Sequence, residues 1–536
     1  MTVPAPPVPA PAGTARPGHA TGTARHRGRS PVWPVLVGCA ALRLWYLTTR
    51  QAQLDGDEAM TGLMVHRILG GHWYAFLANQ RYNGALEQYL QAAVWAVLPQ
   101  TPYTLRLTEV GLAVLACWLV YRVGLELLGP ARAWLAAALF ALGPFFNLWK
   151  GVRSHGPYPT SQVIGLLGLW LALRLRADHP RARWQAALFG LLVGTGAWLS
   201  WASAYLLVPA ACWLLPQMRR RPGLLGPILA AAAAGYLPAA AWTIANGRWA
   251  ALGGPQPDRT PFDRLRLLAG PVLREFLGVG YFDAAPGWPR IAQTAAVLGL
   301  AAAYAVACWR RRAGLADLVL LQDGRRRPAD VLLVVPPVVA VLYAVSKYTW
   351  WAGEPRYLFT AYPALALGLA ALVPRARRPA VTVPVAAALV LAVGGTSVLT
   401  AVRHAGDGDP GRDACLAGGV DWLTGHGVTA AYSDYWTGMP LQLVAGGRVS
   451  IGPMLAGRRK FPELREAADA APPAYVLGHV PDPMRQQEDR VVAMDRALAG
   501  HAVTATRTTV GCLTVYTDLR PALRPWELGL GQPMSR

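Results

Sequence analysis

A short acidic segment follows the first long apolar run of the chain and holds the side chains best suited to acid–base chemistry. Asp55, Asp57 and Glu58 lie within about one helical turn of one another in LDGDEAMTGLM. Carboxylates beside hydrocarbon are costly and usually functional. Two uses fit them: one aspartate as general base on an acceptor hydroxyl, or the group as oxygen ligands of a divalent cation. The structural alternative is a solvated loop in which Asp57 caps a helix beginning near Ala59.

A second candidate segment, YTWWAGEPRYLFTAYP, contains basic side chains that could bind an anion. Arg356 lies two residues after Glu354 and close in sequence to Lys347. A guanidinium with a lysine nearby suits the phosphate of a lipid-linked substrate. Anchors that reach from a membrane helix to the interface, within a belt of aromatic residues, are the alternative interpretation of both cations.

A third segment, LWKGVRSHGPYPT, contributes Lys150, Arg153 and His155. These residues fall on the side of the membrane from which the charge pattern described below excludes most basic residues. They are therefore candidates for anion contact, although a histidine in such a place more commonly has a structural role.

The composition shows what kind of scaffold must position these residues. Of the 536 residues, 54% are apolar and 15% are charged, whereas soluble domains have about 45–50% and about 25%. This excludes a soluble cytosolic enzyme, a disulfide scaffold and a collagen, and predicts a polytopic membrane protein. The net charge of +22 comes from arginines clustered between apolar runs, which charge asymmetry across a bilayer explains better than nucleic-acid binding.

Apolar runs of roughly membrane-spanning length recur along the chain, and we expect about eleven transmembrane helices in residues 32–402. Residues 1–31, which are rich in Pro, Ala and Arg, are expected to form a disordered basic tail. The predicted spans are 32–48, 104–121, 133–149, 159–173, 185–199, 201–216, 223–243, 291–309, 331–346, 357–373 and 380–400.

The arginine-rich loops determine the expected orientation. With the N-terminus in the cytoplasm, the loops 122–132, 174–183, 219–221, 310–327 and 375–378 all face inward, as the positive-inside rule requires. Residues 50–103 and 244–290 are then outer loops. Residues 84–98, which carry Glu87 and Gln88, are predicted to form a juxtamembrane helix on the outer face rather than a span.

The polar C-terminal part, residues 403–536, is predicted to be a small extracytoplasmic α/β domain. Strands are expected near 428–433, 474–478 and 512–517. An odd number of spans places this domain outside, where Cys415 and Cys512 could form a disulfide; two buried thiols remain the alternative. The fold class is thus an all-α polytopic membrane protein with a small C-terminal α/β domain.

The motifs GDEAMTGLMVHRILGG, NQRYNGALEQYL and GEPRYLFTAYPALAL, in this order, resemble the GT-C superfamily of membrane glycosyltransferases. Within it they are most similar to the branch of protein mannosyltransferases and aminoarabinose transferases. The resemblance implies inverting transfer of a sugar from a polyprenyl-phosphate donor to a lipid, glycan or protein acceptor at the outer membrane face. It further implies Asp57 as catalytic aspartate with Glu58 as partner, and Arg356 near the donor phosphate.

The residue pattern extends these expectations. Lys347 and Arg153 would join Arg356 at the phosphate, and Asp55, Glu354 and His155 would support the site. The acidic residue that many relatives have after the third span is missing from GVRSHGPYP, so the resemblance implies no metal dependence, and a divalent cation stays only the alternative considered above. The usage of Ala, Arg, Gly and Pro indicates a GC-rich bacterial genome, and hence a multi-pass plasma-membrane protein.

Two functions of other classes remain open at this point. A transporter or flippase would show repeated halves and acidic residues near the bilayer midplane, whereas the sequence has no internal repeat and its polar clusters are interfacial. A non-catalytic scaffold would use the outer domain to bind a partner. Loss of transfer on Asp57→Asn would separate the enzyme from both.

Overall fold

The structure, a computed structural model, describes residues 32–78, 80–247, 259–278, 288–322, 324–347, 349, 353–374, 379–454, 461–478 and 489–531. The predicted tail 1–31, much of the loop 244–290, the loop 375–378, and Trp350 and Trp351 lie outside the described residues. The helices before the C-terminal domain are α1 (Trp33–Leu47), α2 (Gly56–Leu69), α3 (Leu86–Trp95), α4 (Pro102–Leu127), α5 (Pro130–Leu142), α6 (Phe145–Lys150), α7 (Tyr158–Arg174), α8 (Ala182–Leu199), α9 (Ala204–Arg220), α10 (Leu225–Asn246), α11 (Pro261–Leu267), α12 (Leu273–Phe276), α13 (Trp288–Val319), α14 (Val331–Val345), α15 (Tyr362–Leu372), α16 (Pro379–Val390) and α17 (Thr396–His404).

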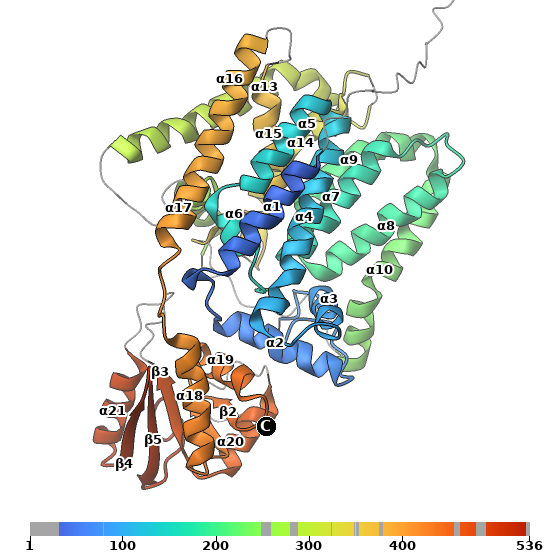
Figure 1. The fold of residues 1–536 in the computed structure, drawn as a ribbon. Helices are drawn as coiled ribbons and strands as arrows, with labels where there is room; N and C mark the ends of the chain where they lie inside the picture. Colours follow the sequence, from blue (N-terminus) through green and yellow to red (C-terminus); the bar gives the residue numbers. More distant parts are fainter. Residues whose placement is uncertain are drawn as a thin grey trace, which may run out of the picture. The chain divides into compact units, whose positions relative to one another are not determined.

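Every predicted span overlaps one or more helices, and the helices pack side by side (Figure 1). Among the described residues, four helical segments are long and apolar enough to cross a membrane: Pro102–Leu127, Pro222–Asn246, Pro328–Val345 and Val381–His404. The chain is therefore a helical membrane protein, while the expected total of about eleven spans stays a prediction.

One predicted span is wrong as a continuous helix. The run 133–149 is broken between α5 and α6, because Gly143 takes a positive φ of 41° and Pro144 cannot donate a backbone hydrogen bond. The break redirects the chain, so that α6 ends at Lys150 and leads into the segment containing Arg153 and His155.

Helices α8 and α10 approach so closely that their backbones touch. A Cβ on Gly190 or Gly194 would lie 2.1 Å or 1.9 Å from the carbonyl oxygens of Ile228 and Ala232. Small residues at such a spacing let membrane helices pack by van der Waals contact where no hydrophobic driving force acts between them.

The C-terminal part of the chain contains helices and a small sheet, consistent with the predicted α/β fold. Its helices are α18 (Arg412–Gly425), α19 (Tyr435–Ala445), α20 (Pro462–Ala470) and α21 (Arg490–Gly500), and its strands are β1 (Ala430–Ser433), β2 (Ser450–Pro453), β3 (Tyr475–Gly478), β4 (Thr504–Val510) and β5 (Leu513–Arg520). The five-stranded sheet has the order β2-β1-β3-β5-β4, with β1 parallel to β2 and β3, and β5 antiparallel to β3 and β4 (Figure 1). The sequence analysis predicted β1, β3 and β5 but missed β2, which is short, and β4, whose threonines and arginine alternate little with apolar residues.

The cysteine alternative left open above is resolved in favour of the disulfide. Cys415 on α18 bonds to Cys512 in the turn between β4 and β5, with Cα atoms 5.8 Å apart. The bond fastens the helix to this hairpin of the sheet.

Helix α19 packs directly on α2, the helix that carries the acidic segment. Leu54, Ala59 and Met60 share one buried cluster with Tyr435 and Met439. Gly56 permits the close approach, since a Cβ there would lie 3.1 Å from both aromatic side chains at the start of α19. The first residues of α2 are therefore held between the helical part and the C-terminal domain.

Candidate active site

The N-terminus of α2 presents the acidic segment in an order that differs from the expected one. The capping residue is Asp55, whose Oδ1 accepts hydrogen bonds from the backbone N–H groups of Asp57 and Glu58 at 3.0 Å each. The prediction that Asp57 caps a helix beginning near Ala59 is wrong, because the helix begins at Gly56. The carboxylate of Asp57 lies beyond the cap and accepts a hydrogen bond from the Tyr435 hydroxyl at 2.6 Å.

Glu58 points away from solvent into a cage of positive charge. Its side chain is fully buried and accepts a bidentate pair from Arg106, with Nε–Oε1 at 2.8 Å. Arg153 Nη1 and the backbone N–H of Ser154 each donate at 3.2 Å. Burial raises the pKa of this carboxyl, but the charges of Arg106 and Arg153 outweigh burial and hold it below its ordinary value.

A chain of three side chains runs from Asp55 to the end of α6. His155 Nε2 lies 2.6 Å from Asp55 Oδ2, and His155 Nδ1 lies 2.5 Å from Lys150 Nζ. Burial opposes ionisation of Asp55, yet the charges of His155 and Arg153 keep its pKa well below the usual range. An ionised carboxylate only accepts, so the His155 Nε2–H donates to Asp55.

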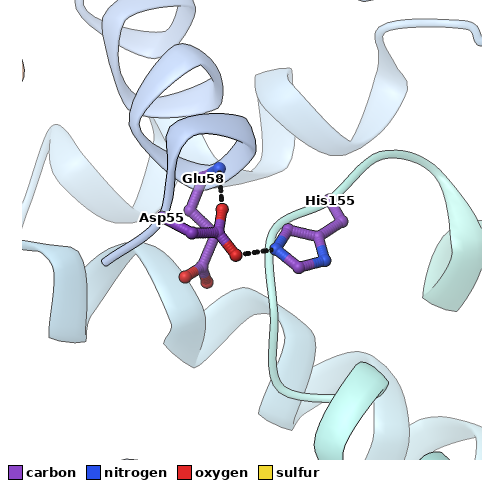
Figure 2. Close-up of side chains that lie close together, drawn as sticks. All are labelled: Asp55, Glu58 and His155. Carbon is purple, nitrogen blue, oxygen red and sulfur yellow. Dashed lines mark hydrogen bonds and ion pairs between the residues drawn. The ribbon is translucent and has the colours of Figure 1, made fainter. Parts of the chain in front are cut away.

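Asp55, Glu58 and His155 place three potential metal ligands within 4.8 Å of one another (Figure 2). The donors around them do not suit a divalent cation. Asp55 Oδ2 accepts hydrogen bonds from His155 Nε2 and, at 3.1 Å, from Arg153 Nη1. Both carboxylate oxygens of Glu58 accept hydrogen bonds from arginines. A cation placed here would lie against two guanidinium groups. The two arginines therefore already supply positive charge to these carboxylates, and the donor set does not fit a metal.

Arg356 and Glu354 form the other predicted cluster, before α15. Glu354 is the N-cap of the 3-10 helix Pro355–Ala361, and Arg356 lies inside it. Arg356 Nε is 3.0 Å from Glu354 Oε2, and Arg356 Nη2 is 3.4 Å from the Tyr357 hydroxyl. The Arg356 side chain is 15% exposed. Lys347 lies half-buried two residues beyond α14.

Lys150 connects the two clusters electrostatically. It is almost fully buried, and burial together with the charge of Arg356 lowers its pKa to about 7, while Asp57, Asp55 and Glu354 oppose the shift. Groups from both clusters thus act on a single ammonium. The structure brings Asp55, Glu58, Arg153 and His155 together, sets Asp57 beside them against the C-terminal domain, and places Lys150 where the charge of Arg356 acts on it.

Two residues of the site, and one buried arginine outside it, were not singled out from the sequence. Arg106 lies inside a predicted span and Tyr435 belongs to a domain without assigned role, so neither was part of a motif singled out above. Arg264, on α11, is buried and donates to the Ala344 carbonyl at 3.3 Å and to Thr349 Oγ1 at 3.1 Å, while its Nε and Nη2 have no partner. A charged residue inside an apolar run is the one sign that could have pointed to Arg106.

Solved structures with the same fold were found, although no protein-family model and no curated protein matches the sequence. ArnT from Cupriavidus metallidurans bound to undecaprenyl phosphate is similar with a TM-score of 0.58 and 13% identity, over 94% of this chain and 99% of that one. Arabinofuranosyltransferase AftD from Mycobacteria gives a TM-score of 0.52 and 18% identity, over 91% and 42% of the two chains. The Archaeoglobus fulgidus oligosaccharyltransferase complex with zinc and sulfate gives 0.50 and 15%, over 90% and 73%. These neighbours are all GT-C membrane glycosyltransferases, which confirms the predicted resemblance at the level of the fold.

Proposed function

On the premise that this chain has the GT-C fold, we propose that it is a membrane glycosyltransferase that moves a sugar from a polyprenyl-phosphate donor to an acceptor hydroxyl. The observation that carries the proposal is the carboxylate of Asp57, held by Tyr435 beside a buried group of cations. The acceptor is a lipid, a glycan or a protein. The N-terminus would lie in the cytoplasm of a bacterial cell, with the site and the C-terminal domain outside the plasma membrane.

The charges are arranged as such a transfer needs them. The leaving group is a lipid phosphate, whose developing negative charge calls for cations at headgroup level. Arg356 and Lys150 supply two of them, with Lys347 as a third that we place on the same side by its position after α14. Arg153, by contrast, donates to Asp55 and Glu58, so we assign it to holding the carboxylates rather than to the phosphate.

The reaction we propose is a direct displacement with inversion. The acceptor oxygen attacks the anomeric carbon as Asp57 takes the hydroxyl proton, and the bond from that carbon to the phosphate oxygen breaks. The electron pair leaves with the lipid phosphate, which the cations stabilise. Asp55 and Glu58 keep the start of α2 in place through the cap and the arginine cage.

The direct test measures the transfer of a labelled sugar from its polyprenyl-phosphate carrier. Full-length protein in nanodiscs is given polyprenyl-phosphate sugars with a labelled sugar, one at a time, and a mixture of small hydroxylated acceptors. Transfer of label from at least one donor supports the proposal. A protein that moves intact donor across the bilayer without releasing label is a flippase, and one that does neither is not the transferase proposed here.

Lys150 is expected to impose a pH dependence on donor use. Its pKa of about 7 means that the charged fraction falls from about 90% at pH 6 to about 10% at pH 8. As pH rises through this range the phosphate loses a cation, so kcat/KM for the donor should fall about tenfold.

The control for this prediction is Lys150→Arg, which stays charged over the whole range. Its kcat/KM should be flat between pH 6 and pH 8, and that of Lys150→Met should be flat and low. A fall of the same size in all three proteins would assign the pH dependence to another group.

Tyr435 is expected to act as a positioning residue for Asp57. Removal of its hydroxyl in Tyr435→Phe leaves the carboxylate without a charge-assisted hydrogen bond, worth about 1.5–3 kcal/mol. We expect kcat to fall about tenfold with the donor KM unchanged. Tyr432→Phe is the matched control, since the Tyr432 hydroxyl bonds to Asp469 at 2.6 Å inside the same domain. Equal effects of the two variants would mean that Tyr435 serves only the stability of the domain.

A further inference from the structure

A cavity of about 460 Å³ lies in the C-terminal domain, in a place that the proposed reaction does not use. It is lined by the end of α18, by the start of β1, by the segment before β3 and by the threonine-rich parts of β4 and β5. Its volume is within the range of about 300–1,000 Å³ of small-molecule sites.

The cavity lies at the end of the sheet where the parallel strands begin, which is the end away from the transfer site. It touches Thr429 and Ala474, which stand at the beginnings of the parallel strands β1 and β3. Tyr435, which reaches Asp57, follows the other end of β1. A ligand in the cavity would therefore be separated from Asp57 by the length of the strand.

The cavity exists because α18 ends before the sheet does. On the face that α18 covers, Leu513 and Val515 of β5 are buried in the core. The next residue on this face is Thr517, and Thr508 of β4 shares the same face. The change from buried aliphatic side chains to threonines coincides with the end of the helix at Gly425, so hydroxyl groups line the floor.

Two aromatic side chains, Trp422 and His426, line another side of the cavity. Trp422 and His426 are stacked, with ring centroids 3.9 Å apart and planes at 17°. His426 Nδ1 lies 2.8 Å from the Trp422 carbonyl oxygen, which can only accept, so Nε2 is left as an acceptor for a ligand hydroxyl. Such a combination of ring surface and hydrogen-bonding groups suits a sugar ring, which has apolar C–H faces and hydroxyls at its edge.

One carboxylate completes the lining. Asp518 has a φ of 53° in an irregular part of the β4–β5 ladder, where a bulge can redirect a side chain. Its Oδ2 accepts from the Thr517 hydroxyl at 3.2 Å. Among the described residues of the lining there is no lysine or arginine, which disfavours an anionic ligand, and the Asp518 carboxylate can accept hydrogen bonds from the hydroxyls of a neutral one.

We propose that this cavity binds one neutral sugar residue, and that it is a docking site for a saccharide part of the acceptor, remote from the point of transfer. The assignment to the acceptor rests on the proposed function, whereas the binding of a neutral sugar does not.

The test measures sugar binding to the full chain in nanodiscs by saturation-transfer NMR. The probes are methyl α-mannopyranoside, methyl β-galactopyranoside and methyl α-arabinofuranoside. At least one should receive saturation on its ring protons, and Thr508→Val should weaken it about fivefold through the loss of one hydrogen bond. Thr509→Val, on the opposite face of the same strand and outside the lining, is the matched control and should leave the signal unchanged, as should Arg356→Ala.

Three results would overturn the inference: no saturation above empty nanodiscs, equal signals in wild type and Thr508→Val, or a signal that only Arg356→Ala removes. Trp422→Ala is a second variant, which tests the aromatic side of the cavity. The label-release assay on wild type reports separately on the proposed function. Sugar binding without label release would refute the proposed transferase and support the sugar site in the cavity. Label release without sugar binding would support the transferase and refute the sugar site.

Discussion

Asp57→Asn should lower glycosyl transfer by about a hundredfold to ten-thousandfold, the range by which a positioned general base accelerates a reaction. The amide has nearly the shape of the carboxylate but cannot take the acceptor proton. Its oxygen can still accept from the Tyr435 hydroxyl, which lies 2.6 Å from Asp57 Oδ1. The measurement is the rate at which labelled sugar leaves the polyprenyl phosphate under saturating donor and acceptor.

Two controls make this result specific to the chemical step. Binding of the donor should survive in Asp57→Asn, because Arg356 keeps its charge, and should weaken only through the lower Lys150 pKa that loss of the Asp57 charge brings. The apparent Tm should stay near that of wild type. Arg356→Ala should show the opposite pattern, with a raised KM for the donor. If Asp57→Asn kept full activity, the base would have to be another group and the proposed mechanism would be wrong.

The sequence was informative about elements that carry their own local pattern. Apolar runs between arginine-rich loops predicted the helices, and β1, β3 and β5 are buried strands that read as short apolar runs. The break at Gly143 was visible in principle, since a Gly-Pro pair inside an apolar run is a helix-breaking signal. Strand β4 was missed because its exposed threonines have no apolar alternation, and its place depends on pairing with β5.

The candidate site shows a different limit. That Asp55, Glu58, Arg153 and His155 belong to one site could be anticipated, since all were singled out from short motifs. Which partner each would take could not, because Arg106 and Tyr435 come from segments far away in the chain. The division of labour between adjacent carboxylates depends on those partners: Asp57 meets a phenol, while Glu58 meets two guanidinium groups. The resemblance to GT-C enzymes implies that Glu58 is a catalytic partner of Asp57. This assignment stays a prediction, which the Glu58→Gln variant tests.

Glu58→Gln should destabilise the protein by about 3–5 kcal/mol, as expected when one member of a buried ion pair is removed. The side chain is fully buried and its charge compensates both Arg106 and Arg153. A neutral amide removes the carboxylate that Arg106 faces and leaves Arg153 with Asp55, at side chains that are almost fully buried. The measurement is the shift of the apparent Tm in detergent, compared with kcat per folded molecule.

The pH dependence of this stabilisation has a defined sign. The pKa of Glu58 is lowered in the folded state, so its contribution is present above the ordinary carboxyl pKa and is lost as pH falls through the lowered value. Wild type should therefore lose stability in acid by more than Glu58→Gln does.

A double-mutant cycle with Arg106→Gln separates a structural role of Glu58 from a chemical one. If the pair is structural, either single variant should be strongly destabilised, and the double variant should be less destabilised than the sum of both, because no uncompensated charge of that pair remains. The folded fraction of Glu58→Gln should then retain most of its kcat. An unchanged Tm with a loss of kcat as large as that of Asp57→Asn would instead place Glu58 in the chemistry. The arginine cage would then tune a catalytic carboxylate rather than hold the start of α2.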